Sequence, residues 1–123
     1  MKRSEAIPAV LKYAAVLAPG DSAEMRPLPS DFVSMDGRVM AIFRGDKMEI
    51  DTGHPALAVT SIKGDEKEQL SGPIPAFTFV PGTLGSGVKW PTIIVGQTIA
   101  ITLKNSGNTE IRVAATISGR RVV

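Results

Sequence analysis

His54 is the only histidine of the 123-residue chain, and the chain has no cysteine. A serine or cysteine hydrolase needs a nucleophile beside a histidine, and a transition-metal site usually needs several imidazole or thiolate ligands. His54 stands in the segment Thr-Gly-His-Pro at 52–55, which is typical of a turn between strands. We therefore expect a structural or solvent-facing histidine, no catalytic residue, no metal site and no cofactor.

Asp46, Glu49 and Asp51 lie close enough in the sequence to supply oxygen ligands to calcium or the carboxylate pair of a glycosidase. On a strand, however, Glu49 and Asp51 point to one face, while Met48 and Ile50 point to the other. Such alternation is typical of a strand with one solvated face. We therefore predict that the protein is not an enzyme. A sandwich enzyme whose acidic residues converge in a cleft is the competing hypothesis.

Trp90 is the aromatic residue that we expect at a contact surface, because it lies between Lys89 and Pro91 at the end of the glycine-rich segment 81–91. The alternative is that its ring closes one end of the domain. The whole chain has one Trp, one Tyr and four Phe. Sugar-binding sandwiches usually stack several rings on a pyranose face, so this small number argues against a carbohydrate-binding module.

From residue 21 onward, short runs of alternating apolar and polar residues are separated by turn residues. This pattern predicts an all-β fold, an antiparallel β-sandwich or barrel with few helical residues. Asp36-Gly37 and Gly45-Asp46 are predicted turns, and 64–75 and 81–91 are predicted loops. The predicted strands are 22–28, 32–35, 38–44, 47–51, 56–62, 77–80, 92–95, 97–104 and 109–118.

The clearest predicted element is an antiparallel hairpin over 97–118. A three-residue loop at 106–108 would pair Leu103 with Ile111, whereas a two-residue loop would place Leu103 opposite Glu110. We therefore predict the three-residue loop, with six apolar side chains of the two strands facing the core. These are Ile99, Ile101, Leu103, Ile111, Val113 and Ala115.

Residues 1–20 are predicted to form a short N-terminal arm, separate from a sandwich domain at 21–123. Apolar residues at helical spacing follow Ser4, but Pro8 and the alanine-rich run equally suit an extended segment. We expect the arm to cross to a neighbouring chain, because apolar surface left in water usually marks an interface. The alternative is a short helix or strand that covers its own domain. The contact candidates in the arm are Ile7, Val10, Leu11, Tyr13 and Leu17.

Length and charge limit the remaining possibilities. The chain is long enough for one domain, and its 14 basic and 12 acidic residues give a net charge of +2. That excess is too small to favour nucleic acid as a partner. Glu5, Pro8 and Lys12 interrupt the first apolar stretch, so it does not resemble a good signal peptide. No segment has the roughly 20 apolar residues of a membrane-spanning helix.

The segment IIVGQTIAITLKNSGNTEIRVAATISGRRVV, together with VLAPGDSAEMRPL, resembles small jelly-roll and sandwich proteins of bacteriophage virions, of the minor capsid or decoration type. The likeness covers about a third of the chain and consists of strand alternation and turn residues. It implies a jelly-roll-like fold and a structural role in a virion shell, with other copies of the chain and a major capsid protein as partners. It also implies Arg120 and Arg121 as contacts. The alternative is a carbohydrate- or receptor-binding module on a virion or cell surface, or secreted.

Overall fold

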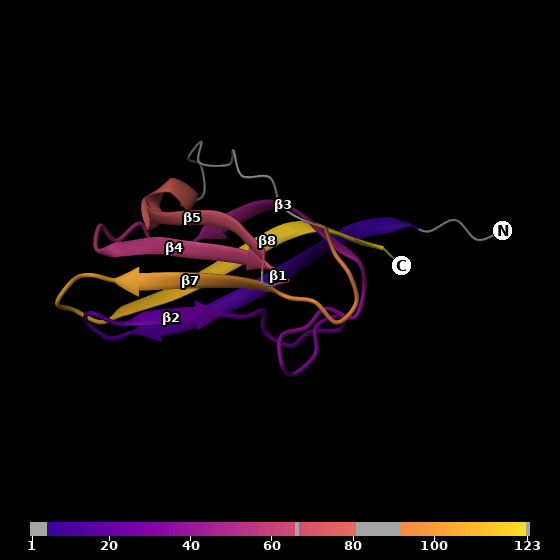
Figure 1. Cartoon of the computed structure of the whole chain (residues 1–123), viewed down its shortest axis with the longest axis horizontal. Coiled ribbons are helices and arrows are strands. Elements are labelled where there is room, and N and C mark those ends of the chain that lie inside the picture. Colours follow the sequence, from indigo (N-terminus) through magenta and orange to yellow (C-terminus); the bar gives the residue numbers. More distant parts are fainter. Residues whose placement is uncertain (1–4, 66, 81–91, 123) are drawn as a thin grey trace.

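The computed structural model describes residues 5–65, 67–80 and 92–122. In these residues, eight strands form two four-stranded antiparallel sheets, and one 3-10 helix lies between the fifth and sixth strands. Figure 1 shows the two sheets stacked, with the strands of one sheet crossing obliquely behind the other. The elements are β1 (Ala6–Leu17), β2 (Ser22–Met25), β3 (Phe43–Ile50), β4 (Leu57–Gly64), β5 (Lys67–Pro75), η1 (Ala76–Phe79), β6 (Thr92–Ile93), β7 (Ile99–Asn105) and β8 (Ile111–Val122).

The strand order is that of a jelly roll. Sheet A has the order β1-β8-β3-β6, and sheet B has the order β2-β7-β4-β5. Each strand of the first half pairs with its counterpart from the other end of the chain: β1 with β8, β2 with β7, β3 with β6 and β4 with β5. A long nested hairpin that is rolled onto itself gives this order. The predicted all-β antiparallel sandwich is therefore confirmed.

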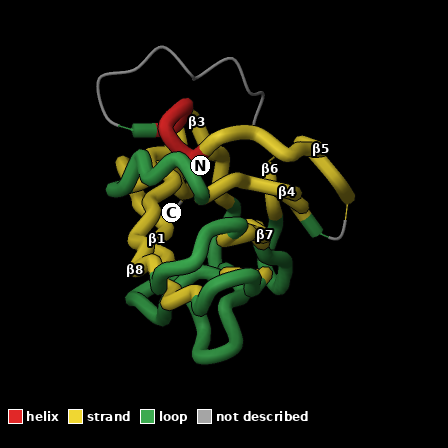
Figure 2. Tube along the Cα trace, turned by 90° about the vertical axis from the view of Figure 1, so that its left-hand side faces the viewer, coloured by secondary structure: helices red, strands yellow, loops and turns green. Residues whose placement is uncertain are grey.

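The core lies between the two sheets, which Figure 2 shows in a view turned by 90°. Alternate residues of each long strand are buried, as in β7, where Ile99, Ile101 and Leu103 have no exposed surface. Phe43 of β3 stacks on Phe32 from the loop after β2, with 6.0 Å between the ring centroids. This apolar layer is what fixes the inward and outward faces of both sheets.

The predicted pairing of the hairpin over 97–118 is wrong. Its two strands exist as β7 and β8, but they belong to opposite sheets: β7 pairs with β2 and β4, and β8 pairs with β1 and β3. The reason is that β1 and β2 supply the partners that a local hairpin would otherwise provide. The six apolar residues predicted to face the core are all buried, so their side chains meet across the core and not along a shared ladder.

We expect Ile101→Val to lower the free energy of unfolding by about 0.5–1.5 kcal/mol, because it removes one methyl group from a fully buried side chain. Lys104→Ala, in the same strand, is the control. The Lys104 side chain is exposed, and its loss should change the free energy of unfolding by less than about 0.5 kcal/mol. Urea denaturation measures both values. Equal effects of the two substitutions would contradict the inward orientation of Ile101.

The N-terminal segment is not an arm that leaves the domain. Residues 6–17 form β1, which pairs with β8 along its whole length, from Ala6 opposite Val122 to Leu17 opposite Ile111. The apolar side chains of this segment that alternate at period two are buried in the core of their own sandwich. The predicted boundary at residue 20, between an arm and the sandwich domain, is therefore not present. The segment is instead a strand that covers its own domain, which was the alternative.

Five other predicted elements also differ from the structure, among them the predicted strand 38–44, of which only residues 43–44 lie in β3. Gly45-Asp46 is not a turn, because β3 runs through it with a bulge between Gly45 and Lys47. The predicted loop 64–75 contains the edge strand β5, whereas the predicted strand 77–80 is largely the 3-10 helix η1. The predicted strand 32–35 is a loop with isolated bridges. Bulges and 3-10 turns depend on what the chain packs against, and alternation of residue types does not record that.

Candidate interaction surfaces

Three of the contact residues predicted in the N-terminal segment belong to the core. Leu11, Tyr13 and Leu17 are buried, and the Tyr13 hydroxyl donates a hydrogen bond of 2.8 Å to the carbonyl oxygen of Ile99 in the opposite sheet. Burial raises the pKa of Tyr13 above its usual value. These side chains hold the two sheets together and are not available to a partner.

The other predicted contact residues have different surroundings. Val10 and Arg120 are exposed on the outer face of sheet A, and Ile7 is half-buried near the start of β1. Arg121 lies on the inner side: its Nη2 atom is 3.0 Å from the Asp31 carboxylate, and its guanidinium carbon is 5.0 Å from the ring centroid of Phe32. Arg121 therefore ties the loop after β2 to β8. Trp90 and the whole predicted loop 81–91 lie outside the described residues.

The His54 ring caps its own turn. Its Nδ1 atom accepts a hydrogen bond of 3.1 Å from the N–H of Ala56, and its carbonyl oxygen accepts one from the N–H of Leu57. A ring nitrogen used in this way positions the entry into β4.

Asp46 and Glu49 of β3 and Asp51, which directly follows it, do not converge. Glu49 pairs with Lys47 at 3.7 Å, and Asp51 accepts a hydrogen bond of 2.8 Å from the N–H of Ala114. Asp46 is exposed at the bulge. No group of three or more potential metal-ligating side chains occurs in residues 5–65, 67–80 and 92–122.

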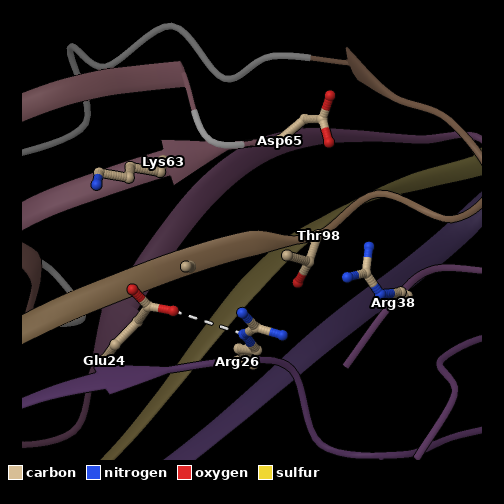
Figure 3. A pocket seen from close by; sticks show the side chains of 7 residues that line it. Glu24, Arg26, Arg38, Lys63, Asp65 and Thr98 are labelled. Carbon is tan, nitrogen blue, oxygen red and sulfur yellow. Dashed lines mark ion pairs between the residues drawn. The ribbon is translucent and has the colours of Figure 1, made fainter. Parts of the chain in front are cut away.

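The outer face of sheet B carries a hollow of about 400 Å³ that is lined mainly by polar side chains. We call it the polar hollow, and Figure 3 shows it from close by. Each side of β7 contributes basic and acidic side chains: Glu24 of β2 lies beside Arg26, and Asp65 directly follows β4, which carries Lys63. The lining residues are Glu24, Arg26, Arg38, Lys63, Asp65, Thr98 and Ala100.

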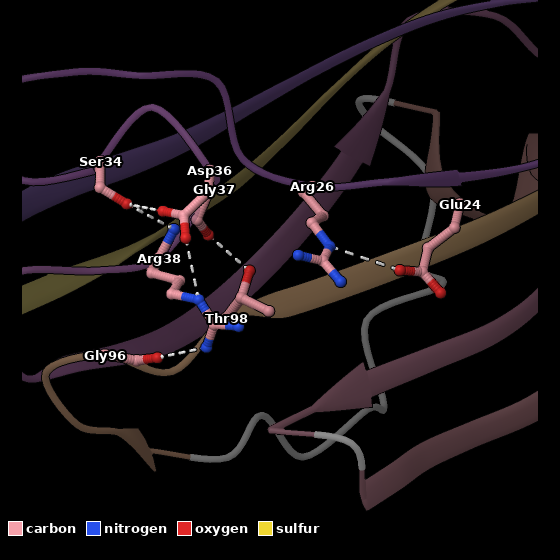
Figure 4. Close-up of polar contacts among 8 residues, drawn as sticks. All are labelled: Glu24, Arg26, Ser34, Asp36, Gly37, Arg38, Gly96 and Thr98. Carbon is pink, nitrogen blue, oxygen red and sulfur yellow. Dashed lines mark hydrogen bonds and ion pairs between the residues drawn. The ribbon is translucent and has the colours of Figure 1, made fainter.

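A tight turn holds one side of the polar hollow, as Figure 4 shows. Arg38 donates from Nε to Asp36 at 3.1 Å and from Nη1 to the carbonyl oxygen of Gly96 at 2.8 Å. The Ser34 hydroxyl also donates to Asp36, and this hydrogen bond is the main cause that lowers the pKa of Asp36. Gly37 has a φ of 80°, and a side chain there would collide with Arg26. The glycine therefore lets the turn dock against Arg26.

Much of the hydrogen-bonding capacity of the polar hollow is already used. Arg26 lies 3.5 Å from Glu24, and Asp65 accepts a hydrogen bond of 2.8 Å from the Gln97 side chain. The Thr98 hydroxyl donates to the carbonyl oxygen of Gly37 at 2.6 Å. What is left is a set of guanidinium and ammonium donors around a shallow space, which could bind the hydroxyl or acidic groups of a ligand.

Two segments with exposed apolar side chains, 39–42 and 94–97, lie near the end of β8, where the N–H of Val122 donates to the carbonyl oxygen of Ile42. The backbone joins their two segments: the N–H of Val39 donates to the carbonyl oxygen of Gln97, and the N–H of Gly96 donates to that of Val39. Continuing the register of Phe43 with Ile93 by one residue places Ile42 beside Ile94. We call this surface the apolar end; it consists of Met40, Ile42, Ile94 and Val95.

Neither surface was predicted residue by residue. The turn at Asp36-Gly37 was expected, but its packing on Arg26 and its approach to Gly96 join segments far apart in the sequence. Isoleucine is typical of core positions, yet Ile42 and Ile94 are exposed. Ile42 directly precedes β3 and Ile94 directly follows β6. The sequence holds no local signal for either arrangement.

Comparison with known proteins gives no relative: no family model, no curated protein and no solved structure matches the chain. Among the residues that the structure describes, no helix has the length and apolar character needed to cross a membrane.

Proposed function

We propose that this protein is a non-enzymatic structural protein of a bacteriophage particle, a minor capsid or decoration protein that binds other copies of itself and a major capsid protein in a symmetric shell. The observation that carries the proposal is the apolar end, where Met40, Ile94 and Val95 are each more than half exposed, at 52%, 54% and 61%. Clustered apolar side chains on a small domain usually mark an interface with another protein.

The fold supports the proposal by analogy alone. Jelly rolls recur in viral capsid proteins and in lectins, so the topology agrees with the resemblance to virion proteins without selecting between shell and ligand-binding roles. The N-terminal segment does not support the proposal, because Leu11, Tyr13 and Leu17 are buried in the core of their own domain. The surface that would bind neighbouring subunits is therefore the apolar end.

Val95→Asp tests this proposal, with Val16→Asp as a matched control. Val95 is 61% exposed at the apolar end, and Val16 is 57% exposed near the opposite end of β1. We expect the unmodified chain to associate in sedimentation equilibrium and Val95→Asp to weaken that association at least tenfold, because the new charge would be desolvated at the interface. Val16→Asp should associate like the unmodified chain. A chain that stays monomeric up to about 1 mM would contradict the proposal.

The polar hollow favours a second function, a carbohydrate- or receptor-binding module on a virion or cell surface, or secreted. Its donors and carboxylates could bind sugar hydroxyls, although none of its lining residues that the structure describes is aromatic. This alternative predicts saturable glycan binding that Arg26→Ala abolishes and that Val95→Asp leaves unchanged. Binding to a glycan array measures it.

A further inference from the structure

Basic side chains outnumber acidic ones on the outer face of sheet A. Alternation along β1, β3 and β8 places five basic and two acidic side chains there, and one further carboxylate, that of Asp51, follows β3 directly. The side chains of this face are Lys12, Arg44, Asp46, Lys47, Glu49, Arg112 and Arg120.

Arg44 and Arg120 are the centre of this basic face. They are direct partners in the register of β3 and β8, and both are exposed. Like charges directly opposite each other on a sheet are destabilising. In the part of the chain that the structure describes, neither arginine forms an ion pair, although Asp46 lines the same shallow hollow of about 280 Å³. An added carboxylate between the two guanidinium groups would relieve their repulsion.

The backbone around this pair is specialised. The bulge at Asp46 brings two consecutive residues, Asp46 and Lys47, to the outer face, so that Met48 returns to the core. A side chain at Gly119 would collide with the carbonyl oxygen of Arg44, which shows how closely β8 approaches β3 here. Bulges often re-aim side chains at functional positions. The bulge and the glycine thus hold Arg44, Asp46 and Arg120 on one exposed surface.

An apolar row adjoins the two arginines. Val122 lies two residues after Arg120 in β8. Its N–H donates a hydrogen bond of 2.9 Å to the carbonyl oxygen of Ile42. Ile42 in turn lies beside Ile94, and both side chains are exposed. The basic face therefore continues into the apolar end, without a polar row between them.

We propose that the outer face of sheet A binds an acidic, apolar-containing segment of a partner protein, with a partner carboxylate held between Arg44 and Arg120 and its apolar neighbours on Ile42 and Ile94. The proposal rests on the proposed function and names the chemistry of the partner. Arginine pairs bind carboxylates through several directed hydrogen bonds, and arginines are common among the residues that dominate interfaces.

A protein segment fits this face better than nucleic acid. Asp46 and Glu49 lie among the basic side chains and would repel a continuous phosphate backbone, whereas a peptide can place single carboxylates between them. The row of Ile42, Val122 and Ile94 adds apolar contact that phosphates and sugars would not use.

The test is a titration of the ¹⁵N-labelled full chain with the blocked peptide Glu-Leu-Glu-Leu-Glu, followed by NMR. We expect chemical-shift changes centred on the amides of Arg44, Asp46 and Arg120, weaker binding at high salt, and loss of at least nine-tenths of the affinity in Arg44→Ser/Arg120→Ser. The matched control is Arg26→Ser/Arg38→Ser, which removes two arginines from the outer face of sheet B and should bind the peptide like the unmodified chain. The NMR spectrum of each variant, recorded without peptide, serves to check that the variant is folded.

Several outcomes would overturn the inference. These are no binding, shift changes centred on the polar hollow, equal binding of the peptide with glutamine in place of glutamate, or tighter binding of a 12-base-pair DNA duplex than of the peptide. Self-association that Val95→Asp weakens, together with any of these results, would leave the structural role standing and remove the acidic partner alone. If the unmodified chain does not self-associate but binds the peptide at Arg44 and Arg120, the acidic partner would stand and the structural role would be removed.

Discussion

Deletion of residues 2–18 should unfold the protein. It removes β1, which pairs with β8 over twelve residues, and it takes Leu11, Tyr13 and Leu17 out of the core. Each fully buried side chain of this size contributes about 1.5–3 kcal/mol. Together with the lost ladder of hydrogen bonds and the newly exposed inner face of β8, the loss equals most of the roughly 5–15 kcal/mol by which a domain is stable.

Circular dichroism and thermal melting measure this outcome. The deletion variant should lack a cooperative unfolding transition, whereas Val16→Ala, which truncates an exposed side chain of the same strand, should melt close to the unmodified chain. Tyr13→Phe gives a graded intermediate: it removes the hydrogen bond to Ile99 and should cost about 0.5–1.5 kcal/mol. A cooperative transition in the deletion variant would show that β1 is dispensable, as an arm would be.

The sequence predicts faces better than partners, and β7 with β8 shows why. Alternation at period two states which side chains of a strand are buried, and Ile101 and Val113 are indeed both buried. It does not state which strand lies alongside, because the partners of β8 are β1 and β3, far away in the sequence. A short turn between two strands favours a hairpin only when no other strand competes for the same edge.

The candidate surfaces were less predictable than the fold for the same reason. The basic face depends on Arg44 and Arg120 becoming direct partners, and these residues are 76 positions apart in the chain. The apolar end depends on Ile42 and Ile94 lying just outside the paired part of β3 and β6. In both cases the residue types are ordinary, and only the register makes them unusual.

Asn105 is another residue whose contacts could not be predicted from the sequence, and its substitution should have a large effect on stability. It is the one buried polar side chain in the part of the chain that the structure describes, with no exposed surface. Its Nδ2 atom donates to the carbonyl oxygens of Leu17, Ala18 and Thr109 at 3.2, 3.3 and 2.7 Å, and its Oδ1 atom accepts from the N–H of Gly107 at 3.0 Å. One side chain thus joins the end of β1 to the β7–β8 connection, which links the two sheets.

Asn105→Leu should therefore lower the free energy of unfolding by at least about 2 kcal/mol, because it removes four hydrogen bonds, each worth about 0.5–1.5 kcal/mol, one of them fully buried. Asn105→Asp keeps the shape but aims a carboxylate at three carbonyl oxygens. Burial and this repulsion should raise the pKa of the introduced carboxyl group, so the variant loses stability as the pH rises above about 4 and is closest to the unmodified chain below that pH. Urea denaturation between pH 3 and 7, with Asn108→Asp at an exposed position of the same connection as control, measures both effects. Equal stability of Asn105→Leu and the unmodified chain would show that water or the relaxed backbone satisfies these groups, and that Asn105 does not hold the sheets together.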